Sequence, residues 1–195
     1  MDSQEYERLL QLARGGDRAA LGQLLEGFRP YLQLLARRRI DPRLGSRVDP
    51  SDLVQVTFLE AQRDLDGFRG GSFSELAAWL RSVLHRNVLR AAERHLDAQR
   101  RNVRREQRLE GSDGHPLAQL PQDESSPSRR AMRGEEAVRL AAALAQIPED
   151  QAEAIRLRHL EGYSLKDMAA ELQRSETAAA GLVKRGLQNL RKLLD

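Results

Sequence analysis

The feature that most constrains the fold is the spacing of apolar residues, which recur every three or four positions along most of the chain. The longest series begins at the capping sequence Ser72-Phe73-Ser74-Glu75 and continues through Leu76, Ala77, Leu80, Leu84, Val88 and Ala91. This spacing places the apolar side chains on one face of an α-helix. Other helix starts precede apolar series at Asp17, Asp49-Pro50, Pro148, Ser164 and Ser175. The sequence therefore predicts an all-α protein with at least seven helices and no strand.

The periodic pattern stops between about residues 97 and 134. Residues 111–127 combine Gly, Ser, Pro, Asp and Gln with few large apolar residues. This composition is typical of a flexible linker. We therefore expect two small helical domains, at 1–98 and 135–195, joined by a flexible linker at 99–134.

Composition excludes several classes of protein. The 195 residues include no Cys and only four scattered His, so neither a metal site nor a cysteine nucleophile is expected. No uncharged run approaches the ~18 residues of a membrane span, and the acidic N-terminus does not resemble a signal peptide. No set of nucleophile, base and orienting group can be assembled. We expect a cytoplasmic protein that is not an enzyme, binds no membrane and needs no cofactor.

The C-terminal segment has the spacing of a helix-turn-helix. Ala169 takes the position where two helices nearly touch, Met168 faces inward, and Gln173 falls in the turn, where Gly is common. Ala179 and Leu182 then face back from the second helix. An ordinary helical hairpin is the alternative.

The second helix of this motif, expected over 176–192, carries cations away from its apolar stripe. Small residues at its N-terminal end allow close approach to a DNA groove, and Lys184 and Arg185 follow where phosphates or guanine edges would lie. A solvated helix face is the alternative. Gly181 and Gly186 call for a packing or contact reason, because Gly in a helix interior costs ~1 kcal/mol relative to Ala.

A basic region follows the helix that starts at Phe73. Nine Arg and three acidic residues lie between positions 81 and 108, although the net charge of the whole chain is only +3. Such a concentration of charge favours a phosphate backbone as partner. We expect the non-core face of this helix to carry Trp79, Val83, Arg86 and Arg90. Trp79 would suit stacking on a base or, alternatively, packing in the core.

Three blocks of the sequence resemble a known family, the extracytoplasmic-function (ECF) sigma factors of bacterial RNA polymerase. Residues 52–61, DLVQVTFLEA, are similar to the family's core-binding segment; residues 73–87 are similar to its FRAWL...RN segment; and residues 144–194 are similar to its helix-turn-helix. The resemblance covers nearly the whole chain apart from the linker. It implies a sigma region 2 helical bundle in the first domain and a sigma region 4 helix-turn-helix in the second.

The resemblance also implies a function. Such a chain binds core RNA polymerase and promoter DNA and directs promoter recognition, DNA melting and transcription initiation; an anti-sigma factor is left open as a further partner. By matching position, the residues that would bind core polymerase are Asp52, Gln55, Val56 and Leu59. Those that would bind the melted minus-ten element, with a flipped base held by the Phe68–Ser72 loop, are Phe68, Arg69, Ser72, Trp79, Arg86, Asn87 and Arg90. Those that would bind the minus-thirty-five element are Arg174, Ser175, Glu176, Thr177, Ala180, Lys184 and Arg185.

The chain departs from the family pattern at Val56, where an acid is usual, and at Ala179 and Gly181, where bulkier residues are usual. Two other functions stay open on the sequence alone. A stand-alone helix-turn-helix transcriptional regulator would explain residues 135–195 but not the basic stripe or the DLVQ block. A helical adaptor would show no dependence on DNA.

Overall fold

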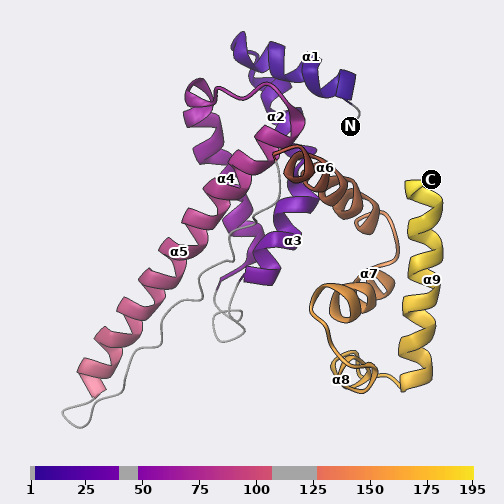
Figure 1. Ribbon diagram of the computed structural model, residues 1–195. Helices are drawn as coiled ribbons and strands as arrows, with labels where there is room; N and C mark the ends of the chain where they lie inside the picture. Colours follow the sequence, from indigo (N-terminus) through magenta and orange to yellow (C-terminus); the bar gives the residue numbers. More distant parts are fainter. Residues whose placement is uncertain (1–2, 40–47, 107–126) are drawn as a thin grey trace.

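The computed structural model describes residues 3–39, 48–106 and 127–195, without the side chains of 3, 95–106 and 127–133 (Figure 1). Within these ranges the chain forms nine α-helices and no strand, which confirms the all-α prediction. The helices are α1 (Ser3–Arg14), α2 (Arg18–Glu26), α3 (Arg29–Arg39), α4 (Pro50–Asp64), α5 (Phe73–Glu106), α6 (Pro127–Leu144), α7 (Glu149–Ile155), α8 (Leu165–Glu171) and α9 (Glu176–Leu194). A 3₁₀ turn, η1 (Leu65–Gly67), follows α4, and a π-helical turn, η2 (Arg156–Leu160), follows α7.

Four of the predicted helix starts are confirmed by side-chain hydrogen bonds to the first turn, and α7 begins directly after Pro148 without such a bond. The Asp17 carboxylate accepts from the N–H groups of Ala19 and Ala20, and the Asp49 carboxylate accepts from Ser51, next to a Pro in the first turn. Ser164 and Ser175 accept from the N–H three residues later. Each of these bonds satisfies a donor that the first turn of a helix leaves unpaired.

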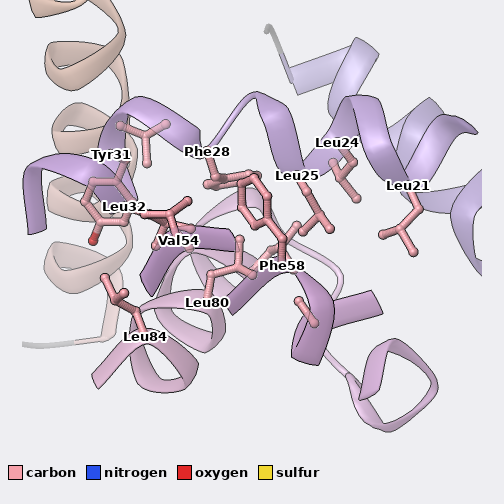
Figure 2. Close-up of a cluster of buried hydrophobic side chains, with 14 of the residues drawn as sticks. Leu21, Leu24, Leu25, Phe28, Tyr31, Leu32, Val54, Phe58, Leu80 and Leu84 are labelled. Carbon is pink, nitrogen blue, oxygen red and sulfur yellow. The ribbon is translucent and has the colours of Figure 1, made fainter. Parts of the chain in front are cut away.

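Helices α1 to α5 surround one apolar core. Figure 2 shows side chains from α2, α3, α4 and α5 converging on Phe28, which is fully buried. Helix α5 packs against α1, α3, α4 and α6, so its buried face is wider than one apolar stripe. The prediction that Val83 lies on the non-core face is wrong: its side chain is 1% exposed, and it follows the buried Leu76 and Leu80 at helical spacing.

Helix α6 joins two apolar clusters. Val138 and Ala141 belong to the N-terminal core, where α6 packs against α3 and α5. Ala143 and Leu144, two and three positions after Ala141, belong to a cluster with Ile155 of α7 and Leu190 of α9. Figure 1 shows α6 between the N-terminal helices and the α7–α9 unit. Of the expected linker, residues 107–126 lie outside the described residues.

Candidate polymerase and nucleic-acid interfaces

One face of α4 is exposed and partly apolar. Asp52, Gln55, Val56 and Leu59 follow one another at helical spacing, and all four are exposed. Val56 is 40% exposed and Leu59 65%, although both are large hydrophobic residues. The opposite face of α4 is buried in the N-terminal core through Leu53, Val54, Thr57, Phe58 and Ala61. The four predicted core-binding residues therefore form one surface, which we call the α4 face.

The loop between η1 and α5, residues 68–72, is packed on one side and open on the other. Phe68 is buried, at 7% exposure, and its ring lies 5.3 Å from the Trp79 ring between centroids. Arg69 and Ser72 are exposed. Phe68 and the half-buried Trp79 thus form the floor of this loop, and Arg69 extends from its outer side.

Glu75 fixes the end of this loop. Its Oε2 accepts hydrogen bonds from the N–H groups of Gly71 and Ser72, both 2.9 Å, and from the Ser72 hydroxyl, 2.8 Å. The Glu75 N–H donates in turn to Ser72 Oγ over 3.3 Å, which completes the predicted capping box. The Ser72 backbone N–H is the largest contribution that holds the pKa of Glu75 below its usual value, and the carboxylate therefore stays charged.

Two residues of α1, which the sequence analysis missed, hold the same loop. The Tyr6 hydroxyl donates to the Ser72 carbonyl over 2.9 Å, and burial raises the pKa of Tyr6 to about 12. Arg14 Nη2 donates to the carbonyls of Gly70 (2.5 Å) and Phe68 (3.4 Å). Tyr6 and Ser72 are 66 positions apart, so no local pattern could have revealed the pair.

The predicted minus-ten residues of α5 differ in exposure. Arg86 and Arg90 are exposed, whereas Asn87 is only 2% exposed. The Asn87 amide lies 3.3 Å from Thr57 Oγ1, and in the orientation that best satisfies its neighbours its nitrogen donates to Glu60. Glu60 also accepts from Arg90 over 2.7 Å. Asn87 therefore joins α5 to α4 and orients Glu60, which holds Arg90.

Helices α8 and α9 have the geometry of the predicted helix-turn-helix. Met168, Ala169, Ala179 and Leu182 are all buried where the two helices meet. Gln173, in the turn, has a φ of 53°, the left-handed conformation that favours Gly. The prediction that Gln173 occupies the turn in place of Gly is confirmed.

The predicted minus-thirty-five residues share one exposed surface. It begins in the turn and covers the N-terminal half of α9, and its members, all exposed, are Arg174, Ser175, Glu176, Thr177, Ala180, Lys184 and Arg185. Gly186 lies on the other side of α9, where a Cβ atom would meet Ile155 Cδ1 at 2.6 Å. The expected packing reason for Gly186 is therefore the close approach of α9 to α7.

Two further features bear on the kind of protein. No three His, Cys, Asp or Glu side chains gather as metal ligands in the described ranges. None of the helices in the described part of the chain is both long and apolar enough to span a bilayer.

Comparison with known proteins identifies these units. Residues 24–101 match the family model described as Sigma-70 region 2, and residues 137–190 match that described as Sigma-70, region 4. ECF RNA polymerase sigma factor SigM of Mycobacterium tuberculosis is 30% identical over 188 residues, which cover 95% of this chain and 83% of that protein. This chain belongs to the ECF RNA polymerase sigma factors. The ECF sigma-E factor of Haemophilus influenzae is 29% identical over 84% of this chain and 81% of its own.

One solved structure resembles this chain along most of its length, with a low score for the superposition of the two folds. It is the sigma factor RpoE with the anti-sigma factor NepR from Bartonella quintana, 24% identical, with 89% of this chain and 94% of that chain covered and a TM-score of 0.32.

The family assigns the function at the level of the whole chain. As an ECF sigma factor, the protein serves RNA polymerase in promoter recognition and transcription initiation. Matches to both sigma regions do not favour a stand-alone regulator, because such a regulator needs only the helix-turn-helix.

Proposed function

We propose that this sigma factor divides its work among three separate surfaces. The α4 face binds core RNA polymerase, the 68–72 loop with the exposed cations of α5 binds melted minus-ten DNA, and the turn and N-terminal half of α9 bind the minus-thirty-five element. The single observation that carries the proposal is the α4 face. Its exposed Leu59 and Val56 lie outside both the apolar core and the helix-turn-helix, so they are available to a protein partner.

In the minus-ten surface, exposure divides the residues by role. Arg69, Arg86 and Arg90 have side chains that can reach phosphates or unstacked bases. Phe68 and Trp79 form the floor of the loop, and the buried Asn87 acts indirectly, through Glu60, on the position of Arg90. Ser72 supports the loop through its bond to Glu75. A base extruded from the duplex would therefore contact the outer side of the loop.

In the minus-thirty-five surface, the N-cap and the first two turns of α9 supply small or short side chains at Ser175, Thr177 and Ala180. These permit close approach of the helix to a major-groove floor. Lys184 and Arg185 follow one turn later, where a cation can bind a phosphate or a guanine edge.

We also propose that the protein acts without catalysis, cofactor or metal, in the cytoplasm where its polymerase is found. The chemistry of initiation then belongs to the polymerase. The sigma factor supplies binding energy and geometry only.

The test of the α4 face compares two exposed leucines. Leu59→Ser removes an apolar contact from the α4 face, and Leu12→Ser makes the same change on α1, where Leu12 is 41% exposed. We expect Leu59→Ser to weaken binding to core polymerase about tenfold, within the range of interface hot spots, and to reduce run-off transcription in proportion. Leu12→Ser should behave as wild type. Equal binding by the two variants would contradict the assignment of the α4 face.

A further inference from the structure

The backbone of the 68–72 loop is held by side chains from outside the loop. The carbonyls of Phe68 and Gly70 accept from Arg14, and the Ser72 carbonyl accepts from Tyr6. The Gly71 and Ser72 N–H groups donate to Glu75. Helix α1 therefore holds the carbonyls of the loop, and the first turn of α5 holds its N–H groups.

Packing restricts the loop further. The guanidinium of Arg14 lies 5.8 Å from the centroid of the Phe68 ring, within cation–π range. A Cβ atom at Gly70 would lie 2.6 Å from the Phe68 ring, so the backbone at Gly70 is in direct contact with that ring. Phe68 is thus enclosed by Trp79, Arg14 and its own loop. These contacts select one loop conformation before any DNA arrives.

We infer that Tyr6 and Arg14 are positioning residues for minus-ten recognition: they fix the 68–72 backbone in the conformation that receives single-stranded DNA, and they act through the loop without contacting the DNA. This inference rests on the proposed role of the loop. A loop that is already ordered loses little conformational entropy on binding, so its preorganisation raises the affinity for DNA.

The contribution of these two side chains can be removed without opening the core. Arg14 is exposed at the C-terminal end of α1, and α1 is anchored by the buried residues Leu9, Leu10 and Ala13. The Tyr6 ring packs 5.3 Å from the Phe73 ring, a contact that Phe can also make. Arg14→Met and Tyr6→Phe therefore remove hydrogen bonds to the loop and keep most of the packing.

The experiment measures binding of holoenzyme to a fluorescent single strand that covers the melted region of a promoter it transcribes. We expect Arg14→Met to weaken binding about tenfold and Tyr6→Phe two- to tenfold, with Arg14→Lys between Arg14→Met and wild type. Discrimination against a strand with a mismatched minus-ten sequence should fall as well. Arg8→Met is the matched control, because Arg8 is exposed on the same helix and carries the same charge.

Salt dependence separates positioning from direct contact. If Arg14 bound a phosphate, its loss would reduce the slope of log K against log salt by about 0.7 for a single strand. A positioning residue lowers the affinity and leaves the slope equal to that of Arg8→Met. A reduced slope, or an affinity equal to that of Arg8→Met, would overturn the inference.

A second arm tests the proposed function of the loop itself. Arg69→Ala removes the exposed cation of the loop, and we expect weaker binding together with a smaller salt slope. If Arg69→Ala and Arg14→Met both bind as wild type, the loop is not a DNA-binding element and the proposed function fails. If Arg69→Ala weakens binding and Arg14→Met does not, the loop binds DNA, and only the positioning role of α1 is refuted.

Discussion

The two interior glycines of α9 predict opposite effects for the same substitution. Gly181 and Gly186 are five residues apart in one helix. Replacing either by Ala gains helix propensity of about 1 kcal/mol. What differs is the space available to the new methyl group.

At Gly181 the nearest atom to an added Cβ is Arg185 Nη1, at 3.2 Å, and this is the mobile end of a long side chain. At Gly186 the Cβ would lie 2.6 Å from Ile155 Cδ1 and 3.3 Å from the Gln151 carbonyl oxygen. Ile155 is 4% exposed, and a backbone oxygen cannot rotate away, so α7 and α9 must separate. Overpacking of this kind costs about 1–3 kcal/mol.

We therefore expect Gly181→Ala to raise the free energy of unfolding by up to about 1 kcal/mol and Gly186→Ala to lower it by up to about 2 kcal/mol. Urea unfolding followed by far-UV circular dichroism measures both values on the full chain, and the linear extrapolation resolves a difference of this size. Each variant is the control for the other, because the change in propensity cancels. If Gly186→Ala is as stable as Gly181→Ala, the close approach of α9 to α7 is wrong.

Three further predictions follow from the loop, the turn and the two DNA surfaces. Burial raises the pKa of Tyr6 from 10.0 to about 12, so its contribution to stability is complete below pH 10 and is lost as the pH rises through 12. In urea unfolding across that window, the free energy of unfolding of wild type should fall by about 2–3 kcal/mol relative to that of Tyr6→Phe. Parallel plots of this free energy against pH would contradict the burial of the hydroxyl. Gln173→Gly should stabilise the protein by up to about 1 kcal/mol because it relieves a left-handed φ, whereas Gln173→Ala should not; equal melting temperatures of the two variants would refute this reason. The double variant Arg86→Ala, Arg90→Ala should reduce open-complex formation on every promoter and lower its salt dependence. Arg185→Ala should instead change which minus-thirty-five sequences are used and leave transcription from pre-melted templates intact. If pre-melted templates rescue only the double variant, the roles of the two surfaces are divided differently.

Much of this architecture could be predicted because its signals are local. Caps at Asp17, Asp49, Ser164 and Ser175, and a turn at Gln173, are each defined by residues within a few positions of one another. The exposed α4 face could be predicted for the same reason, since helical spacing separates it from its buried side. Resemblance to the family, together with periodicity, therefore predicted the surfaces that we propose for polymerase and for the minus-thirty-five element.

What the sequence did not reveal depends on contacts between distant segments. Apolar spacing shows that α5 has a core face, but it does not show how wide that face is, and Val83, at its edge beside Leu76 and Leu80, is buried. The burial of Asn87 depends on Thr57 and Glu60, about 30 positions earlier in the chain. The role of Arg14 depends on backbone carbonyl groups, which every residue has, so the sequence does not show which of them Arg14 binds.

The position of α6 has a consequence for dissecting this protein into fragments. The region 2 match ends at residue 101 and the region 4 match begins at 137, yet Val138 and Ala141 pack in the N-terminal core. A fragment cut at the family boundary would expose to water the apolar surface of α3 and α5 that α6 covers. The C-terminal fragment would carry the complementary apolar patch. The family boundary therefore does not coincide with the boundary of the apolar core. Each half, prepared alone, would expose an apolar patch prone to self-association, which is buried in the whole molecule.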